Sequence, residues 1–490
     1  MSKAESENNV EIGLTVKKSQ NLSEWYQQVI LKSKMADYSP VGGCMIFLPW
    51  SFSIWEKIRE WLDAKLQRLG HENAYFPLFI PESLLKRESE HFAGFTPEVA
   101  WVQAEGDASE ERLAIRPTSE TIMYHMYSKW IRSYRDLPLL LNQWNNVVRW
   151  EFKSTRLFLR TREFLWQEGH TAHASKEEAD TEVRTILGIY QELARDLLAL
   201  PSLAGLKSEG EKFAGALYTT TFEMLMPDGR ALQAGTSHGL GQNFAKAFDI
   251  QYLTKEQRKE YVWQTSWGIS TRLIGALVMV HGDDRGLVLP PAVAPIQIII
   301  VPIYYSPERS KEVTEYSLKV FQKLNKSFRI KIDDREDKTP GWKYNEWELK
   351  GVPLRLEVGP RDIEKQQVIF VRRDTNDKKE KQAVAFQDIE KRAKSVLGDI
   401  QSKLLKKAED FLRAETRGAS SYEEFRRIIA QNAGFVVCSW CGEVECEREI
   451  SSDTGATVRL IPFEDSAPTT ETCFHCNRRA TKLAYFARSY

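Results

Sequence analysis

The sequence has no long apolar run, no excess of charge of one sign and no leader-like start. No stretch approaches the ~18 consecutive apolar residues that a bilayer-spanning helix needs, so we expect no membrane segment. The opening MSKAESENNVEIG has neither a signal-peptide core nor an Arg-rich amphipathic pattern, and we expect a cytoplasmic protein. Lys plus Arg and Asp plus Glu both number 68, so any nucleic-acid-binding surface must be local.

Cysteine is scarce and unevenly placed. One of the six cysteines is at position 44, and the other five lie between 438 and 476. This distribution suits a reducing compartment and a metal site better than a disulfide framework. By spacing alone, two Cys-x-x-Cys pairs, Cys438 with Cys441 and Cys473 with Cys476, form the more regular double knuckle for a tetrahedral Zn²⁺. Cys441 with Cys446 is another close pair, which could replace Cys438 with Cys441.

The most informative stretch runs from Asn142 to His170. Apolar and charged residues alternate over 147–152, which predicts a strand with Arg149 and Glu151 on one face. After a polar loop, residues of one parity share a face of the return strand: Arg160, Arg162, Phe164, Trp166, Glu168 and His170. Arginines and aromatic rings on one sheet face suit a nucleotide, because guanidinium groups match phosphates and aromatic planes stack on bases. The alternative is a surface hairpin with cross-strand ion pairs.

Other segments predict helices and further site candidates. Helices are expected from Leu22, over 51–69 and over 122–131, with a proline-bearing, strand-like segment near 77–81. Thr118 in RPTSE (116–120) could simply cap the third helix. A strand from 263 leads to a helix opening near Ser270 with Arg272 in its first turn, a setting that suits phosphate. An ordinary arginine on an apolar helix is the alternative.

These strings resemble class II aminoacyl-tRNA synthetases. Arg149-Trp150-Glu151 and the return through Phe164 are similar to motif 2, and the string from Gly268 to Arg272 is similar to motif 3. RPTSE, GTSHGLGQNF (235–244) and VHGDDRGLVLPP (280–291) resemble the prolyl-tRNA synthetase family, of the type shared by archaea, eukaryotic cytoplasm and some bacteria. The resemblance covers the chain from about Leu22 to Tyr490.

The resemblance implies a domain order and an activity. After a polar tail (1–20), it implies an α+β class II synthetase catalytic domain with an antiparallel sheet (21–286). An α/β anticodon-binding domain (287–400) and a small α+β zinc-binding C-terminal domain (401–490) follow. The implied activity is that of a proline–tRNA ligase, which uses L-proline and ATP with Mg²⁺ to form prolyl-AMP and then charges tRNA(Pro). It also implies a homodimer, because the helix and proline-bearing strand over 51–81 resemble motif 1, the dimer interface of the family.

The same resemblance assigns site residues. Arg149 and Arg272 are the expected catalytic pair. The expected proline pocket consists of Thr118, Glu120, Arg149, Trp166, Phe213 and His238. The expected ATP site consists of Arg149, Glu151, Arg160, Thr161, Phe164, Gln233, Thr236, Ser270 and Arg272. The expected structural Zn²⁺ ligands are Cys441, Cys446, Cys473 and Cys476, which leaves Cys438 free.

Three further expectations follow. Binding alone can exclude alanine only weakly from a pocket for the larger proline, since a difference of one or two methylenes changes the binding free energy by only ~1–3 kcal/mol. The span from Glu163 to Trp267 is filled by a helix capped at Ser175 and by the EKFAGA and GTSHG segments, so we expect no editing domain and no hydrolytic editing. A sister class II enzyme for another amino acid, or a non-catalytic RNA-binding paralogue, remains the alternative activity.

Overall fold

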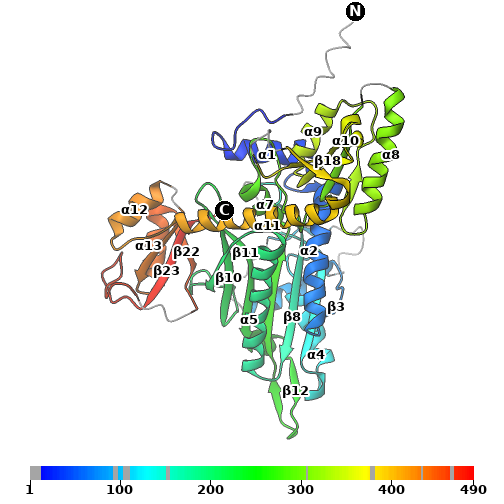
Figure 1. Ribbon diagram of the computed structural model, residues 1–490. Helices are drawn as coiled ribbons and strands as arrows, with labels where there is room; N and C mark the ends of the chain where they lie inside the picture. Colours follow the sequence, from blue (N-terminus) through cyan, green and yellow to red (C-terminus); the bar gives the residue numbers. More distant parts are fainter. Residues whose placement is uncertain are drawn as a thin grey trace, which may run out of the picture.

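The computed structural model describes residues 13–91, 98–102, 111–150, 155–304, 307–375, 381–431, 434–463 and 468–490. Figure 1 shows a central domain in cyan and green, a second domain in yellow above it and a C-terminal domain in orange and red beside it. We define each domain by its main sheet. Helix α11 (Ile389–Ala414) runs across the front of the central domain, from the second domain to the C-terminal domain (Figure 1).

The central domain is organised around a seven-stranded sheet of order β3-β7-β8-β14-β11-β10-β9. Only β3 pairs in parallel with its neighbour, and the other pairings are antiparallel, as expected. The strands are β3 (Glu72–Asn73), β7 (Leu139–Val148), β8 (Glu163–His173), β9 (Leu203–Leu206), β10 (Tyr218–Leu225), β11 (Ala231–Gly241) and β14 (Trp263–Ser270). These include the predicted motif 2 and motif 3 strands.

Helices and short strands surround this sheet. The helices are α1 (Leu22–Lys32), α2 (Pro49–Arg68), α3 (Glu82–His91), α4 (Glu120–Trp130), α5 (Lys176–Glu192), α6 (Asn243–Phe248) and α7 (Arg272–His281), with a π-helical turn over Leu193–Leu197. The short strands are β1 (Ala36–Tyr38), β2 (Met45–Phe47), β4 (Phe79–Pro81), β5 (Trp101–Val102), β6 (Leu113–Ile115), β12 (Gln251–Leu253) and β13 (Lys259–Tyr261). Helix α5 begins as predicted, since the Ser175 hydroxyl accepts from the Glu178 N–H at 3.2 Å.

The two faces of the seven-stranded sheet differ in character. Phe222, Trp267 and Ile269 point to one face and pack in a buried apolar cluster with residues of α5 and α7. Thr236 and Gly268, which are directly paired across β11 and β14, therefore lie on the other face. That polar face is the one available for a ligand.

The predicted motif 2 hairpin forms, with shifted ends. Strand β7 starts earlier than predicted and stops at Val148, so Arg149 follows the strand, while residues 151–154 lie outside the described part of the chain. Strand β8 begins at Glu163, so Arg160 and Arg162 precede it instead of lying on it. The reason is a tight turn, in which the backbone N–H groups of Arg156 and Arg160 each bond the other's carbonyl at 2.7 and 2.9 Å.

The second domain has the expected α/β layout. Its five-stranded sheet has the order β16-β15-β17-β18-β19. Strand β15 pairs in parallel with β16 and β17, whereas β18 pairs antiparallel with β17 and with β19. Its strands are β15 (Ile298–Pro302), β16 (Ile330–Ile332), β17 (Leu354–Val358), β18 (Gln367–Arg372) and β19 (Lys381–Ala385), and its helices are α8 (Pro307–Leu324), α9 (Pro340–Leu349) and α10 (Pro360–Glu364). All residues of β15 are buried, which explains its uninterrupted apolar sequence.

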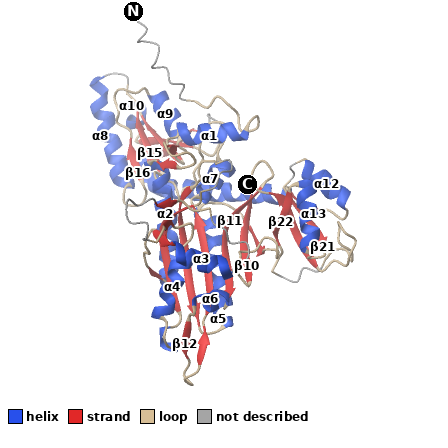
Figure 2. Ribbon diagram, turned by 180° about the vertical axis from the view of Figure 1, so that it is seen from behind, coloured by secondary structure: helices blue, strands red, loops and turns tan. Residues whose placement is uncertain are grey.

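The C-terminal domain has a four-stranded sheet of order β20-β21-β23-β22. Its elements are β20 (Thr416–Gly418), α12 (Tyr422–Ala430), β21 (Phe435–Trp440), α13 (Val444–Thr454), β22 (Ala456–Leu460) and β23 (Lys482–Arg488). The expected boundary at 400/401 falls inside the continuous helix α11. Beyond β23 the chain returns to the central sheet, where the Tyr490 N–H bonds the Ala231 carbonyl at 3.2 Å (Figure 2). No helix within the described ranges is long and apolar enough to cross a membrane.

Candidate active site

A β-bulge in β11 shapes the polar face of the central sheet. Gln233 pairs with Glu223 of β10, and Ala234 is left as an extra residue in the register. Because a bulge reverses the alternation of side chains, Gln233 and Thr236 share a face although they are three positions apart. Thr236 pairs with Gly268 of β14, which joins this face to the rows of side chains on β14 and β8.

Two cavities open on this face and share a wall. The larger has a volume of about 410 Å³ and the smaller about 310 Å³. The larger is lined by Arg149, Thr155, Arg156, Phe158, Leu159, Arg160, Thr161, Phe164, Arg230, Ser270, Arg272 and Tyr490. The smaller is lined by Thr118, Glu120, Arg149, Phe164, Trp166, Lys207, Glu211, Phe213, Thr219, Gln233, Ala234, Gly235, Thr236, His238, Gly268, Ile269, Ser270 and Arg272. Both lists contain Arg149 and Arg272, the expected catalytic pair.

Arg272 is fixed at the junction by main-chain acceptors. Its Nε donates to the Leu159 carbonyl at 3.1 Å and its Nη1 to the Gln233 carbonyl at 3.2 Å. Burial, together with the charges of Arg149 and Arg160, lowers the pKa of Arg272 from 12.5 to about 10. The guanidinium therefore remains charged at neutral pH and faces an excess of positive charge, which an anion would relieve.

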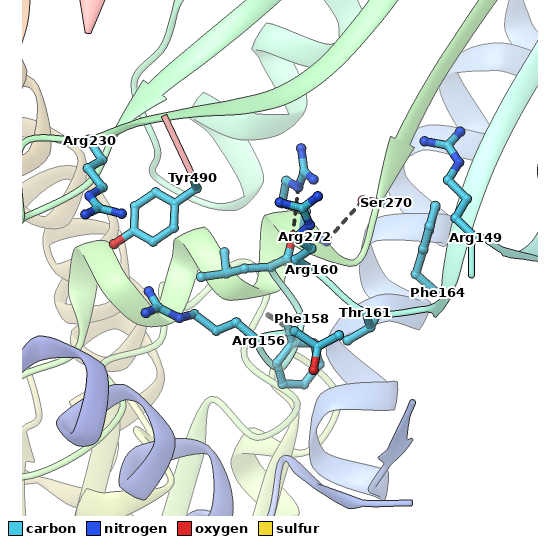
Figure 3. A pocket seen from close by; sticks show the side chains of 12 residues that line it. Arg149, Arg156, Phe158, Arg160, Thr161, Phe164, Arg230, Ser270, Arg272 and Tyr490 are labelled. Carbon is cyan, nitrogen blue, oxygen red and sulfur yellow. Dashed lines mark hydrogen bonds between the residues drawn. The ribbon is translucent and has the colours of Figure 1, made fainter. Parts of the chain in front are cut away.

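Arg149 is placed by aromatic rings. Its guanidinium carbon lies 5.6 Å from the centre of the Phe164 ring and 5.7 Å from that of Trp166, and its Nε donates to the Pro117 carbonyl at 3.2 Å. Cation–π contacts of this kind orient a guanidinium without neutralising it. Arg160 and Thr161 line the larger cavity from the turn before β8 (Figure 3).

The smaller cavity combines acceptors with aromatic walls. The Thr118 hydroxyl donates to the Glu120 carboxylate, and both side chains are buried. The Phe213 ring lies on the His238 imidazole with 4.7 Å between centroids. The two imidazole nitrogens of His238 each lie 2.9 Å from a threonine hydroxyl, those of Thr219 and Thr236. Burial, and then the nearby His170, lower the pKa of His238 to about 3, so its imidazole is neutral at physiological pH.

A buried polar network around Glu168 lies close to Glu120. Glu168 Oε1 accepts from Ser119 Oγ at 2.5 Å and from Asn145 Nδ2 at 2.7 Å, while Glu168 Oε2 lies 2.9 Å from His170 Nε2. Burial alone would raise the pKa of Glu168, but the hydrogen bond and charge of His170 hold it below its ordinary value. Burial would lower the pKa of His170, but Glu168 and Glu120 raise it. Glu120, Glu168 and His170 are close enough to share a metal ion, yet Glu168 and His170 already partner each other.

The structure brings together all the expected proline and ATP residues that it describes. Glu151 was also expected there, and it lies outside the described residues. Lys207, Glu211 and Arg230 line the cavities without having been predicted from the sequence. No periodic pattern marks them, because they lie in loops, and tertiary packing alone brings them to the cavities. Tyr490, at the end of the chain, also lines the larger cavity, and the resemblance of the terminal Ala-Arg-Ser-Tyr to relatives predicts its place near the catalytic domain.

The cysteines form a second candidate site. The sulfur atoms of Cys441, Cys446, Cys473 and Cys476 all lie within 4.8 Å of one another. The Cys446–Cys473 and Cys441–Cys476 sulfur distances are 3.8 and 3.7 Å. Tetrahedral Zn²⁺ with ~2.3 Å Zn–S bonds separates its sulfurs by about 3.8 Å, so the donor set fits zinc. Cys438 lies buried on β21 opposite Ala484 and is not in this group.

An antiparallel sheet with a motif 2 hairpin, a motif 3 helix and a paired cavity between them defines a class II aminoacyl-tRNA synthetase. Family models agree with this class. Residues 101–281 match the tRNA synthetase class II core domain (G, H, P, S and T), residues 297–395 match the anticodon binding domain, and residues 422–490 match the C-terminal domain of prolyl-tRNA synthetase.

Full-length relatives narrow the class to one family. A Proline--tRNA ligase of Natranaerobius thermophilus is 54% identical over 476 residues, covering 96% of this chain and 97% of the relative. Proline--tRNA ligase 2 of Bacillus cereus is 48% identical, covering 97% of this chain and 98% of the relative. The chain belongs to the prolyl-tRNA synthetase family.

Solved structures agree in fold. The crystal structure of Cryptosporidium parvum prolyl-tRNA synthetase complexed with L-proline and AMP has a TM-score of 0.90 and 44% identity. The structure of that enzyme complexed with halofuginone and AMPPNP has a TM-score of 0.92 and 45% identity. Both cover 98% of this chain and 100% of the compared chain.

Proposed function

We propose that this chain is a proline–tRNA ligase, which activates L-proline with ATP and transfers it to the 3′ end of tRNA(Pro). The observation that carries the proposal is the junction of the two cavities at Arg149 and Arg272. A ligase of this kind must hold an amino-acid carboxylate against the α-phosphate of a nucleotide. Two cavities that meet at fixed guanidinium groups suit that task.

The smaller cavity is the proposed proline site. The secondary ammonium of proline has two N–H donors, which Thr118 and Glu120 can accept. The pyrrolidine ring would lie among Trp166, Phe213 and His238, and the neutral state of His238 keeps a second positive charge away from the ammonium.

The larger cavity is the proposed ATP site. Phe164 would stack on the adenine, while Arg160 and Arg272 would hold the outer phosphates. Thr161 and Ser270 line this cavity and would supply further polar contacts, and Gln233 and Thr236 would supply others from the adjoining smaller cavity. Glu151 is proposed to accept from the adenine amino group. The described residues that line this cavity include four other arginines beside Arg272 and no aspartate or glutamate. Mg²⁺ would accordingly be bound mainly by the phosphates, where it would neutralise charge on the leaving pyrophosphate.

The chemistry needs placement more than proton transfer. The proline carboxylate is already ionised at neutral pH, so no general base is needed for its attack on the α-phosphorus. The carboxylate oxygen forms a bond to phosphorus as the bond to the bridging oxygen of pyrophosphate breaks. Arg149, between the two cavities, would compensate the charge that develops on the α-phosphoryl oxygens, and Arg272 the charge on the leaving group. In the second step, a hydroxyl of the terminal tRNA ribose attacks the prolyl carbonyl carbon and releases AMP.

The remaining parts of the proposal concern zinc, assembly and location. The four-cysteine set would hold a structural Zn²⁺ that stabilises the C-terminal domain. A homodimer is supported by exposed apolar side chains on and beside the small sheet β4-β6-β5, where Tyr75, Phe79 and Trp101 are 70%, 46% and 39% exposed. The domain limits 1–20, 21–286, 287–400 and 401–490, a cytoplasmic location and the absence of hydrolytic editing complete the proposal.

Aminoacylation of tRNA tests the proposed function. Purified protein is incubated with ATP, Mg²⁺, labelled L-proline and a tRNA(Pro) transcript, and acid-precipitable label is followed. We expect proline to accumulate on the tRNA. A tRNA whose terminal ribose has been oxidised by periodate should accept none, because its hydroxyl nucleophiles are gone. Equal labelling of both tRNAs, or labelling of neither, would contradict the proposal.

A further inference from the structure

The segment between β9 and β10 connects the proposed proline pocket to the C-terminal domain. Lys207, at its start, and Phe213, within it, line the smaller cavity. Ser208 of the segment contacts Glu447 of α13, and Glu223, the partner of Lys207, contacts Arg459 of β22. Both partners lie more than two hundred positions later in the chain. This wall of the pocket is thus held between two domains.

A backbone contact fixes the start of the segment. The Leu206 N–H bonds the Ile461 carbonyl, and the Ile461 N–H bonds the Leu206 carbonyl, both at 2.8 Å. At Gly205, a Cβ atom would lie 2.3 Å from the Ile461 carbonyl oxygen, so this close approach requires glycine. The C-terminal domain is therefore hydrogen-bonded to the edge of the central sheet.

Lys207, the residue after Leu206, belongs to a buried ionic triad with Glu223 and Arg459. Lys207 Nζ lies 2.9 Å from Glu223 Oε1, and Arg459 Nη2 lies 2.9 Å from Glu223 Oε2. The side chains of all three are at most 6% exposed. Arg459 comes from β22 of the C-terminal domain, whereas Glu223 lies opposite Gln233 in the central sheet. Because buried charges require partners, Arg459 fixes Glu223, and Glu223 fixes Lys207 at the cavity wall.

A third contact ties the segment to the zinc site. The Ser208 hydroxyl donates to Glu447 Oε1 at 2.8 Å, and both residues are buried. Glu447 lies in α13, next to Cys446 of the four-cysteine group. The position of Ser208 therefore depends on how α13 is held.

We propose that the C-terminal domain positions the amino-acid pocket, with Arg459 and Glu447 as positioning residues that act through Lys207, Ser208 and Phe213. This inference rests on the proposed function, because it concerns the proline site of that reaction. Neither Arg459 nor Glu447 lines either cavity. They determine the position of residues 207–213, which form one wall of the smaller cavity, relative to Thr118 and Glu120, which also line it.

The inference predicts a specific kinetic signature. Lys207 and Phe213 line the smaller cavity and not the larger one. Loosening their support should therefore weaken proline binding more than ATP binding. For R459M and E447L we expect the KM for proline to rise about fivefold to thirtyfold, with the KM for ATP changed by less than about twofold. E447Q keeps an oxygen that accepts from Ser208, so it should remain close to the unsubstituted protein.

The test measures proline-dependent ATP–pyrophosphate exchange with full-length R459M, E447L, E447Q and the unsubstituted protein. A matched control is R426Q, which removes a surface ion pair between Arg426 and Asp453 in the same domain, with Nε–Oδ2 3.1 Å. Thermal unfolding of every variant is followed by circular dichroism. R426Q should leave both KM values unchanged.

The outcomes separate the inference from general destabilisation. A selective rise in the KM for proline, seen in R459M and E447L and not in E447Q or R426Q, supports it. Unchanged KM values, equal rises for proline and ATP, or a lower kcat with unchanged KM would overturn it. Absence of proline-dependent exchange in the unsubstituted protein would overturn the proposed function and this inference with it.

Discussion

Replacing Arg272 by lysine should reveal how much of its role depends on a guanidinium. Lysine keeps the charge but cannot donate to the Leu159 and Gln233 carbonyls at the same time as it reaches a phosphate. Loss of one such fixed donor costs about 100-fold in rate where charge develops in a transition state. We therefore expect kcat/KM for ATP to fall about 100-fold in R272K at neutral pH.

The variant should also acquire a pH dependence. Burial and the neighbouring Arg149 and Arg160 lower the pKa of Arg272 from 12.5 to about 10. The same surroundings acting on a lysine ammonium would also lower its pKa below the ordinary value. The lysine would therefore lose its proton, and with it the attraction for phosphate, at a lower pH than an exposed lysine does, whereas Arg272 stays charged.

The assay is ATP–pyrophosphate exchange from pH 7 to 9.5. At each pH, kcat/KM for ATP of R272K is divided by that of the unsubstituted protein, which removes effects common to both. We expect the ratio to decline towards the alkaline end of this range. R162K is a matched control, since the Arg162 guanidinium donates to the Gly42 carbonyl at 2.7 Å and lies over the Trp150 ring. A flat ratio for R272K, or a loss of less than about threefold, would refute the assigned role of Arg272.

Three further predictions concern the nucleotide, pH and zinc. F164L removes a stacking surface worth ~1–3 kcal/mol, so the KM for ATP should rise at least fivefold, and an unchanged value would exclude adenine stacking there. Burial lowers the pKa of His281 to about 4, so its stabilising contribution is complete above about pH 6.5 and is lost as the pH falls towards 4. Between pH 7 and 5 the unfolding free energy of H281Q should therefore fall by about 2 kcal/mol less than that of the unsubstituted protein, as measured by denaturant titration. The same pH dependence in both proteins would contradict this. C446S should lose bound zinc in elemental analysis while C438A retains it, and the reverse result would favour the Cys438 double knuckle.

The motif 2 hairpin shows what could be predicted from the sequence. Alternation correctly placed Phe164, Trp166, Glu168 and His170 on one face, because side-chain direction in a strand follows parity alone. The ends of the strands could not be predicted in this way. They are set by the tight turn that removes Arg160 from the ladder, and alternation carries no information about such a turn.

The bulge in β11 shows a different limit. By simple alternation, Gln233 and Thr236 would lie on opposite faces, and only the pairing register with β10 brings them together. The resemblance to a family supplied both residues without this geometry. Lys207 was missed because its place in the pocket depends on Glu223 and Arg459, and Arg459 comes from another domain.

The zinc site lies between these cases. The sequence placed the cysteines in two groups, but spacing alone favoured Cys438 over Cys446. Strand β21 directs Cys438 into the core of the C-terminal domain. Cys446 lies in the first turn of α13, where its sulfur comes close to that of Cys473. The choice of ligand therefore follows from where a strand ends and a helix begins, which spacing does not record.

The measurement that tests the central claim most directly is ATP–pyrophosphate exchange with each of the twenty amino acids in turn, before any tRNA is added. The account predicts exchange with proline above all others, and its loss in R149A, because Arg149 lies between the two cavities. Preferred exchange with a different amino acid would contradict the assignment of the smaller cavity to proline. Full proline-dependent exchange in R149A would contradict the mechanism.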